Sequence, residues 1–166
     1  MNSIFERRSI RKYTDQVVTD DMVTQLLKAA MYAPSAGNQQ SWEFIIVKNK
    51  ETLLKITEVH PYSQMLKEVG VAIVVCGNLQ KEKFKDYWVQ DCSAATQNIL
   101  LAAHAAGLGT VWLGVYPVTD RVNGVKKILN LPEDIIPLSI IPIGFPAEKK
   151  IVNDRFNETY IHHEKW

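Results

Sequence analysis

Three arginines occur within five residues near the start of the chain, in the segment RRSIR at positions 7–11. The planar guanidinium group matches phosphate oxygens in a two-pronged geometry, and Ser9 adds a hydroxyl donor. A solvated basic terminus is the competing interpretation of this pentapeptide. A further arginine, Arg155, lies near the other end of the sequence and could converge on the same anion. The pattern therefore indicates a candidate phosphate site.

A second segment, APSAGNQQSW at positions 33–42, combines small residues and a glycine with three consecutive side-chain amides, Asn38, Gln39 and Gln40. A connecting turn is the simpler interpretation, but a turn does not need a row of neutral donors and acceptors. Such groups suit the polar edge of a flat heteroaromatic ligand. Trp42 is expected to anchor the segment in the core.

A third segment, GTVWLG at positions 109–114, is bordered by glycines, which let a backbone approach a flat ligand closely. A buried strand between turns is the alternative. Taken together, the three segments require a ligand with an anionic phosphate end and a flat heteroaromatic end with neutral polar atoms. Flavin mononucleotide (FMN) has both.

Other kinds of site are disfavoured. The sequence has no GxSxG, HExxH or Walker motif, and the glycines of GLGT at 107–110 close a helix instead of opening one, unlike a dinucleotide-binding turn. Adjacent His162 and His163 would not share a helical face and do not indicate a metal site. His104 is expected to be a hydrogen-bonded core residue, and Cys92 a structural thiol.

These candidate residues must be positioned by the helices and strands that the sequence predicts. A helix over 19–33 begins at Thr19 or Asp20 and carries its apolar residues on one face. The apolar run 70–77 predicts a strand buried on both faces, and the alanine-rich stretch 86–107 predicts a buried central helix that ends at Gly107. The remaining expected elements are helices over 51–59, 64–69 and 120–129 and strands over 43–48, 110–115 and 137–144.

Two further features concern the last third of the chain. Pro142 lies inside the last predicted strand and favours an edge position or a bulge there. The final 22 residues, from Phe145, are polar and irregular, and their aromatic residues suggest docking on a partner subunit. The order of elements mixes helices and strands without strict alternation, which favours the α+β class.

The composition fits one domain over residues 1–166. The formal net charge of +1 disfavours nucleic acid or an anionic membrane as a partner. Two cysteines, no secretory signal and no apolar tract long enough for a bilayer lead us to expect a soluble, cytoplasmic protein.

The ordered motifs RRSIRKY, APSAGNQQSW, QDCSAATQNILLAAHAAGLGTVWLG and IGFPAE with a DRF tail are similar to those of the nitroreductase family, the FMN-dependent NAD(P)H oxidoreductases. The resemblance covers nearly the full length. It implies an α+β fold with a central mixed β-sheet surrounded by helices, and an intertwined homodimer with FMN at the subunit interface. NADH or NADPH would reduce the flavin at N5, and a nitroaromatic, quinone or similar acceptor would reoxidise it in a ping-pong cycle. No side-chain general base is implied.

By this resemblance, one subunit would contribute arginines and Ser9 to the phosphate, ribityl chain and pyrimidine edge, and the other would contribute the amide segment. Backbone groups of the third segment would lie against the flavin ring. The implied cofactor-binding residues are Arg7, Arg8, Ser9, Arg11, Pro34, Ser35, Ala36, Asn38, Gln40, Trp112, Leu113, Gly114 and Arg155.

The chain departs from the family pattern at two positions. Asn153 replaces a frequent lysine, so that phosphate affinity would rest more on the arginines. Ser41 replaces a frequent proline, which is expected to loosen the backbone of the amide segment. Two alternatives stay open: a non-catalytic FMN-binding or electron-transfer protein, and a family branch with another reaction, such as dehalogenation or flavin cleavage.

Overall fold

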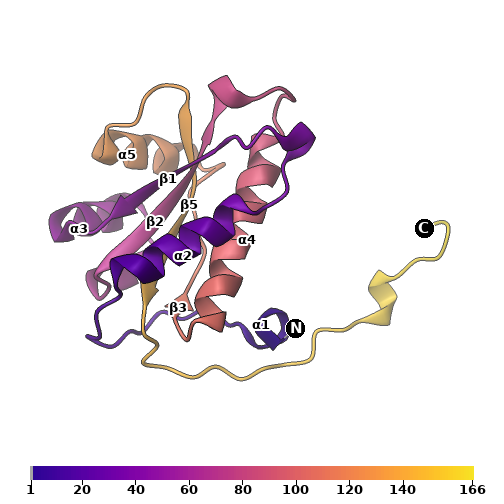
Figure 1. The fold of residues 1–166 in the computed structure, drawn as a ribbon, viewed down its shortest axis with the longest axis horizontal. Coiled ribbons are helices and arrows are strands. Elements are labelled where there is room, and N and C mark those ends of the chain that lie inside the picture. Colours follow the sequence, from indigo (N-terminus) through magenta and orange to yellow (C-terminus); the bar gives the residue numbers. More distant parts are fainter. Residues whose placement is uncertain (1) are drawn as a thin grey trace.

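A computed structural model describes residues 2–166, and it places helices on both faces of one five-stranded sheet (Figure 1). The strand order is β1-β2-β5-β3, and β4 also pairs with β5. The named strands pair antiparallel, while an isolated parallel bridge joins Ser9 to Thr110. The α+β class is confirmed. The strands are β1 (Trp42–Val47), β2 (Val71–Asn78), β3 (Gly109–Thr110), β4 (Leu113–Gly114) and β5 (Ile135–Gly144).

The predicted helices and long strands agree with the structure to within two residues at each end, with one exception. The helix expected over 64–69 is only the 3-10 turn η2 (Gln64–Lys67). The helices are α1 (Asn2–Glu6), α2 (Asp20–Met31), α3 (Lys50–Val59), α4 (Trp88–Ala105) and α5 (Thr119–Leu129). Further 3-10 turns are η1 (Ala36–Asn38), η3 (Leu79–Lys81) and η4 (Glu158–Tyr160).

Strand β2 forms the centre of the core, because its side chains alternate between two apolar clusters. Val71, Ile73 and Val75 pack with residues of α2 and α4 on one face. Ala72 and Val74 pack with residues of α3 and α5 on the other face. Residues on both faces are buried, as the apolar run in the sequence predicts.

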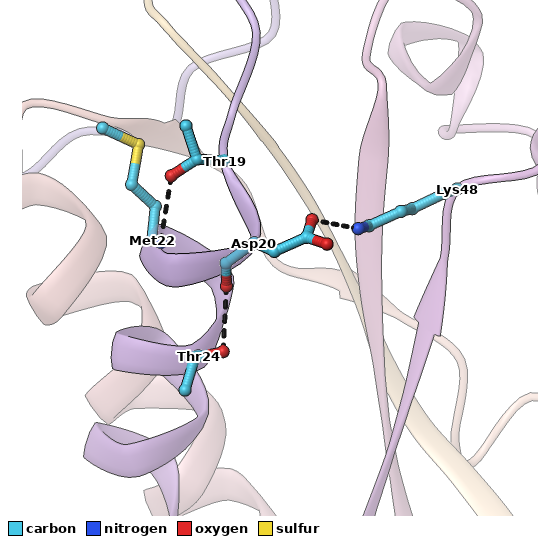
Figure 2. A network of polar contacts seen from close by, with 5 residues as sticks. All are labelled: Thr19, Asp20, Met22, Thr24 and Lys48. Atoms are coloured by element: carbon cyan, nitrogen blue, oxygen red, sulfur yellow. Dashed lines mark hydrogen bonds and ion pairs between the residues drawn. The ribbon is translucent and has the colours of Figure 1, made fainter.

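The start of α2 is set by local polar contacts (Figure 2). The Thr19 hydroxyl accepts a hydrogen bond from the Met22 backbone N–H at 3.3 Å, so Thr19 is the N-cap. The Asp20 carboxylate pairs with Lys48, just beyond the end of β1, and Thr24 donates to the Asp20 carbonyl. These contacts fix where α2 begins against the sheet, and hence the direction in which it enters the amide segment.

The end of α4 is a glycine stop. Gly107 has a φ of +75°, and the Leu108 N–H donates back to the Ala103 carbonyl at 2.8 Å. This pattern closes the helix and turns the chain toward β3. The prediction that Gly107 ends this helix is confirmed.

Two strand predictions are wrong in detail. The segment 110–115 is not one strand, because β3 and β4 are separated at Val111 and Trp112. Strand β5, which contains Pro142, is not an edge strand but lies between β2 and the β3/β4 side of the sheet. The alternative expectation of a bulge in this strand is met away from Pro142, because the register between β2 and β5 shifts between the pairs Val75–Ser139 and Cys76–Pro137. The pairs Thr110–Ile143 and Leu113–Ile140 leave Pro142 opposite the break between β3 and β4. The sheet thus accommodates a residue without an N–H donor where its outer ladder is interrupted.

The C-terminal segment leaves the body of the protein after a short paired stretch. Tyr13 bridges to Pro146, and the Ala147 N–H donates to the Lys12 carbonyl. From Ile151 to Trp166 every residue is exposed, and the segment extends past α1 and away from the sheet (Figure 1).

Candidate functional site

The N-terminal arm carrying RRSIR lies directly beside GTVWLG. Ser9 forms its bridge to Thr110, and the Ile10 N–H donates to the Thr110 carbonyl at 2.9 Å. Gly109 permits this approach, because a Cβ on it would lie 2.7 Å from Cγ2 of Ile10. Two of the three candidate segments are therefore joined within one chain.

The predicted arginines gather around two adjoining cavities that share Arg8, Asn153 and Arg155. One, of about 580 Å³, is also lined by Arg7 together with Ile4 and Phe5 of α1. The other, of about 570 Å³, is also lined by Ser9, Arg11 and two lysines. The expectation that the arginine of the tail approaches those of the N-terminal arm is thus met in the structure.

The charge of Arg7 is uncompensated. Its Nη1 atom is buried without a hydrogen-bond partner among residues 2–166. Burial lowers the pKa of Arg7, and the neighbouring positive charges of Arg155 and Arg8 lower it further. The four ion pairs of the described chain all use lysine, so none of them neutralises these arginines. A buried cationic donor among like charges is suited to binding an anion.

Arg8 has an additional role as a tether. Its guanidinium group donates to the backbone carbonyls of Phe5, Arg7 and Ile151, at 2.8, 2.8 and 3.1 Å. It thereby connects the end of α1 to the C-terminal segment. Arg11 is exposed, and its backbone N–H donates to the Glu148 carboxylate at 2.7 Å.

Gly114 lies on the outer strand of the sheet with its backbone facing outward. The Val115 N–H donates to Leu138 of β5 at 2.9 Å. Because successive residues of a strand direct their N–H and C=O groups to opposite sides, those of Gly114 point away from β5. A Cβ on Gly114 would meet no atom within 4 Å, so the space in front of it is open. Trp112 is half-buried, whereas the Leu113 side chain is buried in the core on the α3/α5 face.

The amide segment is preorganised. Gly37, Asn38 and Gln40 all have φ values of about +50°, and the Gln40 side-chain amide donates to Oδ1 of Asn38 at 3.0 Å. Both amide side chains are exposed. Pro34, Ser35 and Ala36 line a separate cavity of about 350 Å³, together with residues of α4.

The residues that hold this segment were not predicted as a group. Asp91, in the first turn of α4, is buried and accepts three hydrogen bonds, from the Ala36 N–H, the Gln39 amide and the Ser41 hydroxyl. Gln39 in turn accepts from the backbone N–H groups of Lys83 and Phe84. The expected loosening at Ser41 is therefore wrong, because Ser41 is buried and bonded. Trp42 is buried in the core, as predicted.

The two halves of the candidate site lie at opposite ends of α4. Asp91 holds the amide segment near the start of the helix, whereas Arg8 shares a cavity with His104 near its end. These positions are about 20 Å apart along the helix axis, at 1.5 Å per residue. Within one chain, the arginines and the amides therefore do not line one cavity.

The structure also places the histidine and the cysteine that the sequence analysis singled out on α4. His104 is not a core residue, because it is only partly buried and lines a cavity with Glu6 and Arg8. Cys92 is buried, its thiol donates to the Cys76 carbonyl, and burial raises the pKa of both cysteines, that of Cys76 to about 12.

Among residues 2–166, no group of His, Cys, Asp and Glu could hold a metal ion. Across the same residues, no helix is both long and apolar enough to cross a membrane.

Comparison with known proteins finds relatives that match nearly the whole chain. The family model described as Nitroreductase family matches residues 4–65 and 58–145. A protein of Methanothermobacter thermautotrophicus with the provisional name NADH dehydrogenase/NAD(P)H nitroreductase is 52% identical over 166 residues, which are all of this chain and 87% of that protein. A crystal structure from Parabacteroides distasonis with the same provisional name is 45% identical, with a TM-score of 0.96 and coverage of 99% of this chain and 97% of that one.

A third relative is a solved structure of a provisionally assigned nitroreductase of Desulfovibrio desulfuricans in complex with FMN. It is 29% identical, with a TM-score of 0.86, and covers 99% of this chain and 96% of that one. The family match spans most of the sequence, and the folds agree over nearly the whole chain. The chain belongs to the nitroreductase family.

Proposed function

We propose that this protein binds FMN and transfers hydride equivalents from NADH or NADPH to a small oxidised acceptor. The observation that carries the proposal is the buried, unpartnered Nη1 atom of Arg7 beside Arg8 and Arg155. Such a group is costly to bury unless an anion completes it. The phosphate of FMN has the charge and the oxygens to do so.

The residues fit the other parts of the cofactor as well. The open space at Gly114 suits a flat ring against the backbone, and the exposed amides of Asn38 and Gln40 suit neutral polar edges. When bound, the flavin supplies the hydride chemistry at N5, while the protein supplies binding, orientation and electrostatics. Arg11 would place positive charge at the pyrimidine edge and stabilise an anionic reduced ring.

The protein is proposed to act as a homodimer, with each FMN held between subunits. The arginines and the amides of one chain lie about 20 Å apart along α4, so that one cofactor would meet both sets only with a second chain. The exposed tail supports the same assembly, because Phe156, Tyr160 and Trp166 are 71, 80 and 100% exposed in the single chain. The 1–166 domain would then be complete only as a pair.

The test is reconstitution with FMN followed by anaerobic addition of NADH or NADPH. We expect a yellow protein whose visible flavin absorption is bleached by at least one nicotinamide. An acceptor panel of nitroaromatics and quinones should then restore the colour, with parallel lines in initial-velocity plots if the cycle is ping-pong. A protein that cannot be loaded with FMN would refute the proposal, and one that is loaded but not reduced would be a non-catalytic FMN-binding protein.

A further inference from the structure

The outward carbonyl of Gly114 is held by two side chains from different elements. The ring nitrogen Nε2 of His60, which follows α3, lies 2.9 Å from the Gly114 oxygen. Nη1 of Arg121, in the first turns of α5, donates to the same oxygen at 3.0 Å. The peptide group between Gly114 and Val115 is therefore fixed at both ends, since the Val115 N–H is bound to Leu138.

His60 is unusual among the polar residues of the core. Its exposed fraction is 1%, and its other ring nitrogen, Nδ1, is buried without a partner among residues 2–166. A carbonyl only accepts, so His60 must carry its proton on Nε2. The arrangement leaves one ring nitrogen unsatisfied and secures one hydrogen bond to a single backbone oxygen.

Arg121 is also committed to this place. Its guanidinium carbon lies 5.4 Å from the centroid of the Tyr62 ring, and Tyr62 meets His60 edge to face. Stacking of this kind holds the planar group and leaves its donors free for the carbonyl. Neither His60 nor Arg121 forms an ion pair in the described chain.

We infer that His60 and Arg121 are positioning residues that clamp the Gly114 carbonyl, restrict rotation about the Cα–C bond of Gly114, and so help to hold the adjoining Leu113–Gly114 peptide with its N–H toward the flavin ring. The inference rests on the proposed function, because it needs a ligand in the open space before Gly114. The physical reason is local. Gly114 has no side chain to restrain its backbone, and β4 is only two residues long, so the strand ladder alone holds the peptide weakly. Two donors on one oxygen supply the missing restraint.

The experiment compares His60→Leu, His60→Gln and wild-type protein, each in the FMN-free and FMN-saturated forms. Labelling leucine carbonyls with ¹³C and glycine nitrogens with ¹⁵N selects two amides by NMR, those of Gly109 and Gly114, because only these glycines follow leucine. Gly109 is the internal control. In wild-type protein, FMN should slow hydrogen exchange of the Gly114 amide.

In His60→Leu we expect about five-fold weaker FMN binding, the loss that one hydrogen bond typically causes. At saturating FMN, the Gly114 amide should also lose much of its protection while Gly109 keeps its own. His60→Gln should restore both properties, because its amide nitrogen can donate where Nε2 does. In a second FMN-free sample, labelled with ¹³C at the glycine carbonyls and ¹⁵N at valine, the ¹³C shift of the Gly114 carbonyl should move in the leucine variant and return in the glutamine variant.

Arg121→Leu provides a second route that does not depend on replacing a core residue, since Arg121 is only partly buried. Lys126→Leu is its control, because it removes the same charge from α5 but contacts the Glu133 carbonyl. We expect weaker FMN binding in the first and wild-type binding in the second. FMN affinity and Gly114 protection that stay at wild-type values in both His60→Leu and Arg121→Leu would overturn the inference alone. Wild-type protein that binds no FMN would overturn the proposed function, and the clamp role with it.

Discussion

The side-chain amide of Gln39 donates to Oδ2 of Asp91 at 2.7 Å, and both residues are buried. Gln39 thereby joins α4 to the segment after η3, because its side-chain oxygen accepts hydrogen bonds from the backbone N–H groups of Lys83 and Phe84. The proposed ligand-binding amides on either side of Gln39 owe their position to a neighbour that points inward. The first prediction follows from this bond.

Asp91→Asn should lower the free energy of unfolding by about 2 kcal/mol, because an amide offers donors where Gln39, Ser41 and Ala36 already donate. Urea denaturation measures the loss, and limited proteolysis should show earlier cleavage within 33–42. Asp86→Asn, at an exposed position just before α4, is the control and should have little effect. Equal losses in the two variants would mean that the buried bonds contribute nothing.

Arg7→Met combined with Arg155→Met should have opposite effects on the free and the loaded protein. Without FMN, the variant should be more stable than wild type, because a partly buried cation and its like-charged neighbour are removed. FMN binding should be weaker by about ten-fold or more, the typical scale for losing charge-assisted hydrogen bonds. Thermal denaturation and flavin-fluorescence titration give the two numbers. Lys28→Met, on the exposed side of α2, should change neither.

Replacing Phe156, Tyr160 and Trp166 together by serine should weaken the homodimer without unfolding the protein, since these side chains are exposed in the single chain. Sedimentation at a series of concentrations reports the association. Arg155 is retained, but Phe156 lines the arginine cavity, so the double variant Tyr160→Ser with Trp166→Ser separates loss of the dimer from a direct effect on FMN binding. Val17→Ser, at another exposed apolar residue, is the comparison. A dimer unaffected by the triple change would exclude the tail from the interface.

Stability should fall as the pH is lowered through the range where a free histidine titrates, and His60 should account for part of the fall. Burial lowers the pKa of His60 below its ordinary value of 6.5, and the nearby charge of Arg121 acts in the same direction. Below pH 6.5 the unfolded chain therefore binds a proton that the folded chain does not, and unfolding is favoured. Urea denaturation between pH 5 and 8 should show a shallower slope for His60→Gln than for wild type. Identical slopes would contradict the assignment.

Much of the fold follows from local pattern. The alternation of Val71 to Cys76 between two apolar clusters and the glycine stop at Gly107 are properties of short stretches, and both are visible in the sequence. The position of Pro142 is not local. Whether a strand that contains proline can be central depends on what lies opposite, and here the ladder is broken between β3 and β4.

The candidate site likewise has one part that the sequence predicts and another part that depends on contacts between distant residues. Three arginines within the five residues 7–11 indicate an anion site, and the structure gathers Arg7 and Arg8 with Arg155 around one cavity. The three partners of Asp91 lie 50 to 55 residues from it along the chain, and His60 lies 54 residues from Gly114, so that spacing does not reveal these contacts. Asp91 is a single acidic residue at the start of an otherwise uncharged helix. That pattern is the signal in the sequence from which buried hydrogen-bond partners could have been predicted.

The placement of arginines and amides at opposite ends of α4 has a genetic consequence. In the proposed homodimer, each cofactor takes its arginines from one chain and its amides from the other. A chain that carries Arg7→Met and Arg155→Met is defective in one half, and a chain that carries Asn38→Gly and Gln40→Gly, changes that keep the positive φ values, is defective in the other. When the two are mixed, every heterodimer holds one site with both defects and one with neither. At an FMN concentration too low to load either variant alone, the two proteins should therefore complement each other and recover activity.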